Sequence, residues 1–407
     1  MNGESLLVTT RQYQEEAKKW LTALRRGENV SVIFFPKTDR LRRLQQLLED
    51  QDFLRRVLGK GARYMFQVVD FSAHIIEDKH DLHEHIAEQL NLLRLSDTRL
   101  SFDQWLAYFR KNSMNMVLIL PQAEKLLTTE ERNALTQLSY VVDTLNPTFT
   151  VLSFYETDIT HPSLASILPS TRLYQNIYFY PLYSASDALM FIRYLEKKWN
   201  FVCSRKVEQE ILAACGGHFW FIKEAVRQLA TSDSMSLAQE GMTFRLRTVY
   251  DQLLPSERGT LNKIITRKKD FSIDEQHCLS YFKKMNFIDA QNQLLVRHYQ
   301  DFVLQRKNIA SEFAIQDNRI FLNQIPIDKF FSKKEYRVLK TLLERKGTLV
   351  TRDEIAKSIW PSNTEEHFSD WAIDQIIARM RKSMQELFLS PALITTVRGK
   401  GYLLNLS

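Results

Sequence analysis

The last quarter of the chain follows a pattern of helices and strands that few folds satisfy. Ser332 and Thr351 each stand three residues before a glutamate, which is the spacing of a capping box at a helix start. Asp370 is the expected N-cap of a third helix, and residues 394–404 alternate around a glycine-bearing turn, as a hairpin does. Short strands, three helices and a hairpin in this order predict a winged helix over residues 309–407.

Four short strings in this segment are more specific than its periodicity. In chain order they are Phe331–Tyr336, Gly347–Ile355, Ile373-Asp374 with Ala378–Lys382, and Thr395–Tyr402. Together they resemble the OmpR/PhoB-type DNA-binding domain of bacterial response regulators. The resemblance implies that the third helix enters the major groove and that the hairpin, or wing, reaches the phosphates or the minor groove.

Polar and basic side chains of the third helix and the wing are the candidate DNA contacts. The apolar face of the helix, Ile373, Ile377 and Met380, would hold it to the core while its basic face meets base edges. Basic side chains on a wing suit phosphates or the minor groove. The candidate DNA-binding residues are Trp371, Gln375, Arg379, Arg381, Lys382, Thr396, Arg398 and Lys400. The expected partner is double-stranded DNA; the alternative is that Arg379 and Arg398 are exposed solubilising charges.

The third helix departs from the family at three positions. Members commonly carry Arg, His and Arg where this chain has Trp371, Ile376 and Ala378. The loss of these contacts leaves open a weak, shape-based or cooperative mode of binding. Trp371 and Ile376 are alternatively available to touch a thymine methyl group or a protein partner.

The first 180 residues alternate short apolar strands with amphipathic helices, which predicts a parallel sheet covered on both faces. The expected strands are 30–35, 64–69, 116–120, 149–154 and 177–180, and the expected helices 11–26, 39–58, 82–93, 102–109 and 129–143. Three helical patterns follow within 184–230, the last two separated by Gly216-Gly217, and residues 244–306 form a further small helical unit with an extended piece at 287–296.

This order of elements resembles an AAA+ or STAND-type ATPase, and the double glycine followed by an aromatic, Cys215–Phe219, resembles a STAND-type lid. The resemblance implies a core over 1–180, a helical lid over 181–235 and a winged-helix-like unit over 236–308. The predicted fold class is therefore multidomain α/β plus α+β: a P-loop-like parallel αβα sheet with a helical lid, a winged-helix-like middle unit and a C-terminal winged helix.

The residues of a nucleotide site are missing from the places where that resemblance puts them. A P-loop needs glycines whose N–H groups wrap phosphates, but Pro36–Leu41 contains none. Pro121-Gln122 stand where carboxylates would bind magnesium, and Glu124 is expected to be a surface charge. The sequence also lacks the pattern of a phosphoacceptor receiver domain. No pair of acidic residues follows the first strand, and Asp70 is a single carboxylate at the end of the second. We expect no catalytic residues, no cofactor and no enzymatic activity; nucleotide binding without turnover is the alternative.

Bulk properties allow this interpretation without deciding it. The net charge of +7 and pI near 9.1 permit nucleic-acid binding. Three distant cysteines indicate a reducing cytoplasm, and no apolar run is long enough for a membrane span. His74, His80, His83 and His85 lack a convincing third ligand, so an exposed polar helix face is expected there and no metal.

The sequence thus predicts a cytoplasmic bacterial transcription regulator that binds DNA. Its ATPase-like module would serve oligomerisation or partner sensing, with a homo-oligomer, a protein bound at the N-terminal module or RNA polymerase as partners. Two alternatives remain: a replication-initiator-like DNA-binding protein, and a non-DNA interaction module in a signalling or defence complex.

Overall fold

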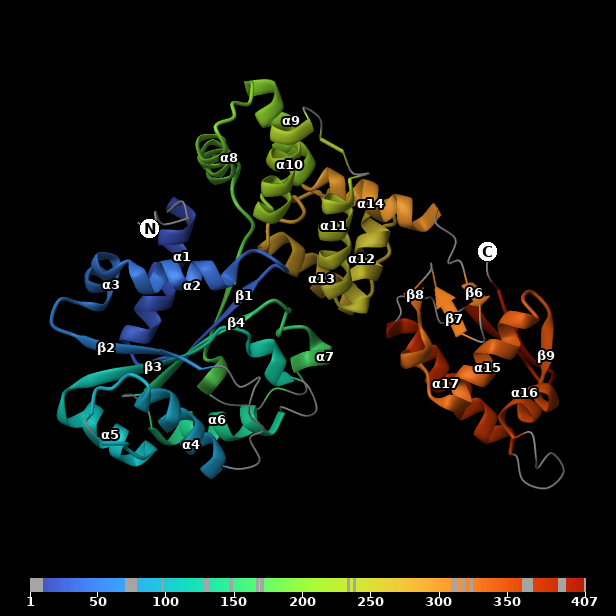
Figure 1. Cartoon of the computed structure of the whole chain (residues 1–407), viewed down its shortest axis with the longest axis horizontal. Coiled ribbons are helices and arrows are strands. Elements are labelled where there is room, and N and C mark those ends of the chain that lie inside the picture. Colours follow the sequence, from blue (N-terminus) through green and yellow to red (C-terminus); the bar gives the residue numbers. More distant parts are fainter. Residues whose placement is uncertain are drawn as a thin grey trace. The chain divides into compact units, whose positions relative to one another are not determined.

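The computed structural model divides the chain into two compact units, unit 1 (Met1–Phe302) and unit 2 (Val303–Ser407), shown in Figure 1. Each unit is described by itself. The structure describes residues 10–69, 79–96, 98–127, 132–145, 149–165, 168, 172–232, 235–236, 239–308, 313–316, 319–322, 325–360, 369–386 and 393–405. Within this part of the chain, no helix is long and apolar enough to cross a membrane. Asp70 and His74 lie outside the described residues.

Unit 1 is built on a five-stranded parallel sheet in the order β2-β3-β4-β1-β5. The strands are β1 Val30–Phe34, β2 Arg63–Val68, β3 Met114–Leu120, β4 Phe149–Tyr155 and β5 Asn176–Tyr180. All residues of β1 and β4 are buried, because apolar side chains on both faces of these central strands meet covering helices. The predicted parallel sheet is confirmed.

Helices cover both faces of this sheet. The helices of the core are α1 Arg11–Arg25, α2 Arg40–Glu49, α3 Gln51–Leu58, α4 Lys79–Asn91, α5 Phe102–Lys111, α6 Arg132–Leu145 and α7 Pro162–Ala165, with 3-10 turns at Ala123–Leu127 and Arg172–Tyr174. Helices α1, α2 and α3 share one apolar cluster with Val32 and Phe34 of β1, whereas α5 and α6 contact β3 and β4 (Figure 1). The single helix expected over 39–58 is wrong. It is interrupted at Asp50, whose side chain accepts a hydrogen bond from the N–H of Phe53 and caps α3.

The segment expected to be a helical lid, called the lid below, holds the three expected helices, α8 Ala185–Trp199, α9 Arg205–Cys215 and α10 Phe219–Ser232. The double glycine separates α9 from α10 because both positions need the absence of a side chain. Gly216 has a φ of +54°, and a Cβ on Gly217 would stand 2.0 Å from the carbonyl oxygen of Tyr183. The α9–α10 turn therefore packs directly on the segment that follows β5, and the N–H of Tyr183 donates to the oxygen of Gly217.

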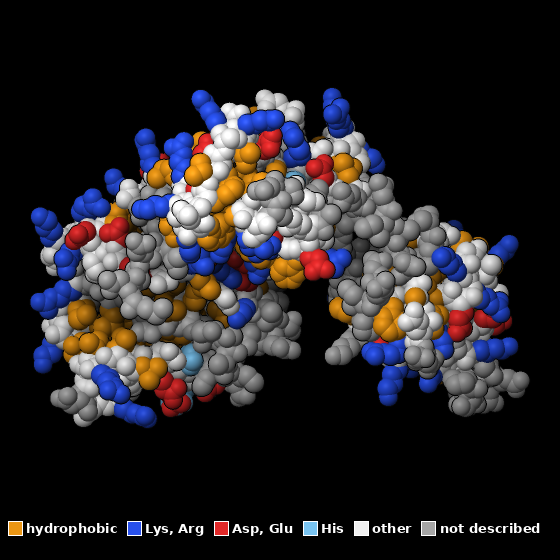
Figure 2. All heavy atoms as spheres, turned by 45° about the horizontal axis from the view of Figure 1, so that its top comes forward, with side chains coloured by type: hydrophobic (Ala, Val, Ile, Leu, Met, Phe, Trp, Pro, Cys, Tyr) orange, Lys and Arg blue, Asp and Glu red, His pale blue; other side chains and the backbone are white. Residues whose placement is uncertain are grey.

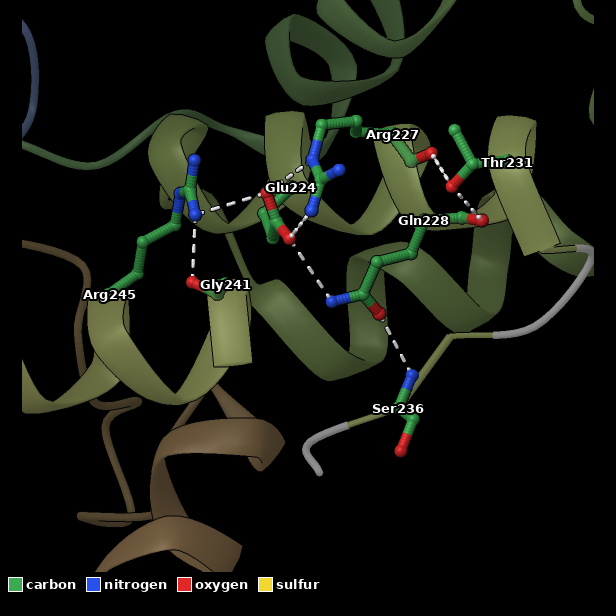
Figure 3. A network of polar contacts seen from close by, with 7 residues as sticks. All are labelled: Glu224, Arg227, Gln228, Thr231, Ser236, Gly241 and Arg245. Carbon is green, nitrogen blue, oxygen red and sulfur yellow. Dashed lines mark hydrogen bonds and ion pairs between the residues drawn. The ribbon is translucent and has the colours of Figure 1, made fainter. Parts of the chain in front are cut away.

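The middle segment contains α11 Glu240–Gln252, α12 Pro255–Ile265, α13 Ile273–Lys284 and α14 Arg297–Asn308, with an antiparallel bridge between Ile288 and Leu294 ahead of α14. A buried carboxylate joins it to the lid (Figure 3). Glu224 of α10 pairs with Arg227 at 2.9 Å and with Arg245 of α11 at 3.0 Å. Burial opposes the ionisation of Glu224, but these arginines outweigh it and lower the pKa of the carboxyl group.

A second polar cluster joins the middle segment to the loop after β4. Asp158 is buried and accepts hydrogen bonds from Thr160 at 2.6 Å and His277 at 2.9 Å. His161 lies within 3.0 Å of the hydroxyl of Ser256. Next to this cluster, the carboxyl of Glu257 accepts from the N–H of Leu254, and burial raises its pKa to about 8. The start of α12 thus carries a carboxyl group that favours its neutral form.

We expect the stability of unit 1 to fall between mildly acidic and mildly alkaline pH because of Glu257. Its folded-state pKa lies above the ordinary value of 4.5, so its stabilising contribution is complete below that pH and is lost as pH rises through about 8. At about 1.4 kcal/mol per pKa unit, the loss is at most roughly 4 to 5 kcal/mol. Urea unfolding from pH 5 to 8.5 should therefore show a smaller decline for Glu257→Gln than for the unmodified chain. Glu210→Gln, an exposed control, should behave like the unmodified chain, and equal declines in all three would contradict the expectation.

Unit 2 has the predicted winged-helix order. Its elements are β6 Phe313–Gln316, β7 Arg319–Leu322, β8 Ile325–Pro326, α15 Lys333–Glu344, β9 Leu349–Thr351, α16 Arg352–Ile359, α17 Asp370–Glu386, β10 Ile394–Val397 and β11 Gly401–Leu404. Capping boxes at Ser332 and Thr351 open α15 and α16 as expected. The predicted cap at Asp370 is wrong: the side chain of Ser369 accepts the hydrogen bond from the N–H of Ala372, and Asp370 is already helical.

Candidate nucleic-acid interface

The third helix of unit 2, α17, has one face in the core and one free face. Ile373, Ile377 and Met380 are buried as expected, and so is Ile376, at 2% exposure. The expectation that Ile376 is available for a DNA or protein contact is therefore wrong, because its side chain completes the apolar cluster of the domain. After Asp370 at its start, the exposed side chains recur every three or four residues, so they form one stripe along the helix; they are Trp371, Asp374, Gln375, Ala378, Arg379 and Lys382.

The stripe contains one large exposed aromatic side chain and one exposed arginine. Trp371 is 70% exposed, although an indole of this size normally gains stability by burial. Arg379 is 65% exposed, and its Nε lies 3.9 Å from Glu335, which is beyond hydrogen-bonding distance. Glu335 is engaged in capping α15. The N–H groups of the Arg379 guanidinium are therefore available to donate hydrogen bonds to a ligand. The 3.9 Å contact with Glu335 balances its positive charge only in part.

Arg381 is placed differently from the other candidate contacts. Its guanidinium donates to the carbonyl oxygen of Ile394 at 2.6 Å and to the hydroxyl of Thr396 at 2.8 Å. Both acceptors belong to β10, so Arg381 fastens α17 to the wing. Thr396 stays exposed and, since its oxygen accepts from Arg381, its hydroxyl proton remains available.

The wing presents its basic side chains at a tight turn. Arg398 and Lys400 are exposed on either side of Gly399, which has a φ of +72°. Gly401 follows at the start of β11, where a Cβ would stand 2.0 Å from the carbonyl oxygen of Val350 in β9. Glycine is required there because β9 and β11 pair so closely, whereas Gly399 serves the turn.

A second tie between helix and wing escaped the sequence analysis. Asp374 of α17 accepts hydrogen bonds from Tyr402 of β11 and, at 2.8 Å, from Arg352 at the start of α16. The hydrogen bond from Tyr402 and then that from Arg352 lower the pKa of Asp374. Burial and Asp374 raise the pKa of Tyr402 to about 12. The strings that resemble the family include all three residues, but only their contacts show this joint role.

Unit 1 has a cleft of about 300 Å³ where the sequence resemblance places a nucleotide. It is lined by Lys37, Asp39, Arg40, Leu41, Gln122, Glu156, Phe219 and Trp220. The segment after β1 turns sharply, with Lys37 at a φ of 60° and Asp39 at 66°, and the hydroxyl of Thr38 donates to the oxygen of Phe35. Neither residue is a glycine, so this turn differs from the glycine-rich loop that wraps phosphates.

Arg40 occupies the inner part of this cleft. Its guanidinium makes two hydrogen bonds with Glu124, one of 2.7 Å, and lies 3.8 Å from Glu156 at the end of β4. Only 6% of the Arg40 side chain is exposed. Glu124, which was expected to be a surface charge, is instead ion-paired with Arg40 and has 24% of its side chain exposed. Glu124 and Glu156 are both paired with Arg40, and Asp39 is paired with Arg42. These arginines occupy the positions through which magnesium or a phosphate would have to reach the carboxylates.

His218, just before α10, contacts the same turn. Its Nε2 lies 3.0 Å from the carbonyl oxygen of Pro36, and burial lowers the pKa of the imidazole to about 4. The ring is neutral at pH 7, so it can donate one hydrogen bond without carrying a buried charge. Among the described residues, no group of three or more histidine, cysteine or acidic side chains could hold a metal ion.

Comparison with known proteins identifies the C-terminal part. The family model described as "Transcriptional regulatory protein, C terminal" matches residues 329–404. Unit 2 carries an OmpR/PhoB-type DNA-binding domain. The match covers α15 to β11, so it contains both the α17 stripe and the wing.

Curated relatives share this part of the chain. Sensory transduction protein BceR of Halalkalibacterium halodurans is 42% identical over 72 residues, which are 18% of this chain and 30% of that protein. Response regulator protein GraR of Staphylococcus epidermidis is 31% identical over 123 residues, 29% of this chain and 52% of that protein. The chain thus spans about half, or less, of the length of these relatives.

Solved structures that are similar to longer parts of the chain have much lower sequence identity to it. A Walker-type ATPase of Pyrococcus abyssi has a TM-score of 0.44 at 10% identity, covering 72% of this chain and 95% of its own. The Aeropyrum pernix ORC1 protein in complex with DNA has a TM-score of 0.40 at 12% identity, covering 100% of this chain and 91% of its own.

Proposed function

We propose that the whole protein is a bacterial cytoplasmic transcription regulator that binds duplex DNA through unit 2 and does not hydrolyse nucleotides. The observation that carries the proposal is the α17 stripe beside the wing. It exposes Arg379, Lys382, Arg398 and Lys400 on a domain whose family is that of transcriptional regulatory proteins. Helix and wing fit the major groove and the adjacent backbone, respectively.

Trp371 suits a reading mode with few base-specific hydrogen bonds. Its exposed indole can cover a thymine methyl group, while Arg379 and Gln375 supply donors along the same stripe. Arg381 acts as a positioning residue, since its donors hold the wing. We therefore propose that phosphate contacts and DNA shape contribute a large part of the affinity.

Unit 1 supports a role in association rather than in turnover. Arg40, Glu124 and Glu156 pair with one another in the cleft, and the turn after β1 has no glycine, so the groups needed for phosphate and magnesium are absent from these positions. We propose that this unit mediates self-association or contact with a protein partner such as RNA polymerase. Analytical ultracentrifugation of the full chain with and without DNA would test this; a strict monomer in both conditions would contradict self-association.

The regulator function is tested by capturing fragments of a bacterial genomic library on the full-length protein over a series of salt concentrations. We expect fragments with a shared motif, and weaker capture by Arg398→Ala and by Arg379→Ala. Each lost phosphate contact should reduce the slope of log affinity against log salt by about 0.9; a lost base contact should instead relax the motif.

Lys346→Ala provides the matched control in unit 2. Lys346 is exposed next to Gly347, whose N–H donates to the oxygen of Leu404. Leu404 pairs with Ile394 at the base of the hairpin, the end away from the turn that holds Arg398. Lys346→Ala should therefore leave capture unchanged. No capture even at low salt, or equal effects of all three substitutions, would refute DNA binding by this surface.

A further inference from the structure

A groove of about 750 Å³ lies in the middle segment, apart from the surfaces described so far. One wall is the turn between α12 and α13, and the other is the hairpin that precedes α14. The turn contributes Arg267, Lys268 and Lys269, and the hairpin contributes Gln291 and Gln293. The groove thus has cations on one side and amides on the other, and its remaining lining is the apolar set Ile264, Ile265, Phe271 and Leu294.

The cations of this groove have no ion-pair partner among the described residues, although exposed Asp270 follows Lys269 in the chain. Arg267, Lys268 and Lys269 are exposed, and their side chains make no ion pair or hydrogen bond with any residue that the structure describes. Lys263, one turn earlier on α12, differs because it binds Glu275 at 2.7 Å. No carboxylate is among the described residues that line the groove. Neighbouring unpaired cations repel one another, so an anionic ligand is favoured at this site.

The wall formed by the hairpin is fixed in place. The carboxylate of Asp289 accepts from the N–H of Gln293 at 2.7 Å, and the N–H of Asn292 donates to the oxygen of Asp289. Asp289 therefore serves the turn instead of facing the groove. The amides of Gln291, Gln293 and Gln300 are left as neutral groups that can donate to phosphate oxygens.

Surface charge alone would not single out this groove. Figure 2 shows lysine and arginine side chains dispersed over much of the visible surface, where acidic side chains are interspersed among them. What distinguishes the groove is the combination of three consecutive unpaired cations, a concave shape and amide donors on the opposite wall.

We propose that the α12–α13 groove binds the backbone of duplex DNA, as a second and sequence-independent contact of this chain. This inference rests on the proposed function, since unit 2 would bring DNA to the same molecule and raise its effective concentration at the groove. Cations and amides without an acidic partner suit a polyanion with regularly spaced phosphates. The groove then adds affinity and salt dependence but no sequence preference.

The test compares full-length variants on a long duplex that carries a captured site. Arg267→Ala/Lys268→Ala/Lys269→Ala removes the groove charges, and Lys197→Ala/Lys198→Ala/Arg205→Ala removes the same charge from exposed positions of the lid. We expect the groove variant alone to lower the salt slope by about 2 to 3 and to weaken binding at ~100 mM salt by roughly tenfold. In the unmodified chain, bound duplex should protect Lys268 and Lys269 from acetylation more than Lys197 and Lys198.

Each outcome separates this inference from the proposed function. If Arg398→Ala weakens binding but the groove variant matches the lid control, the groove contact is overturned and the regulator function stands. If the groove variant loses affinity for anionic vesicles or single-stranded RNA while its duplex binding is unchanged, the DNA assignment is overturned too. If Arg398→Ala leaves binding unchanged, the proposed function of unit 2 fails, and acetylation protection then tests the groove on its own.

Discussion

Replacing Gly401 with alanine is expected to destabilise unit 2 by about 3 kcal/mol and to abolish its DNA binding. The added Cβ would meet the carbonyl oxygen of Val350 at 2.0 Å and the Cα of Thr351 at 2.9 Å. Both obstacles are backbone atoms, so no side-chain rotation relieves the overlap. Strand β9 would have to separate from β11, and Tyr402 would lose its register opposite Val350.

Gly399→Ala is the matched control for this prediction. Gly399 has a φ of +72° in the same hairpin, but nothing lies within 4 Å of a Cβ built on it. Its substitution should cost only about 1 kcal/mol, the strain of a left-handed alanine. Urea unfolding of both full-length variants, followed by DNA binding at equal salt, would decide. Equal stability and affinity of the two variants would contradict the role of close strand approach.

Replacing Arg40 with alanine should destabilise unit 1 by about 3 kcal/mol, because it leaves the carboxylates of Glu124 and Glu156 near each other without their cation. Burial already raises the pKa of Glu156, so its charge depends on nearby cations, with Arg40 the largest contributor. The loss of stability should be smaller in Arg40→Ala/Glu124→Gln, because one of the two unpaired carboxylates is removed. Chemical denaturation measures the free energy of unfolding of the unmodified chain and of these two variants.

Arg42→Ala separates this effect from a general loss of positive charge. Arg42 lies two residues further along α2 and pairs with Asp39 at 3.3 Å, with 40% of its side chain exposed. An exposed pair of this kind contributes at most about 1 kcal/mol. Should Arg40→Ala and Arg42→Ala cost the same, or should Glu124→Gln bring no recovery, the ion pairs in the cleft would not be what stabilises this part of the core.

Local signals predicted most of the elements, and contacts between distant residues account for most of the errors. Capping residues and apolar periodicity locate α15 and α16, because these signals depend on neighbours within one helical turn. The break at Asp50 was missed because apolar residues continue on both sides of it. Ile376 was misplaced because the family comparison suggested a DNA contact, whereas its place in the helix repeat, next to Ile373 and Ile377, puts it in the core.

The sequence predicted which residues of the candidate site are exposed, but not the hydrogen bonds that connect its side chains. Arg379, Lys382, Arg398 and Lys400 are exposed where the resemblance placed them, yet their contact with DNA stays a prediction. No sequence pattern marks Arg381 as the residue that binds β10, since its acceptors lie 13 and 15 positions further along the chain. The pairing of Arg40 with Glu124, separated by 84 positions, is similarly invisible before folding.

The fastening of the wing to α17 has a consequence for the thermodynamics of recognition. Because Arg381 holds β10 and Asp374 holds Tyr402, the chain loses the freedom of the hairpin when it folds, not when DNA arrives. We therefore expect DNA association to need little further ordering of the hairpin, with a small entropic penalty and a rate limited mainly by encounter. Since a rigid domain cannot adapt to every duplex, we expect its selectivity to come from the sequences that bend to match it at low elastic cost.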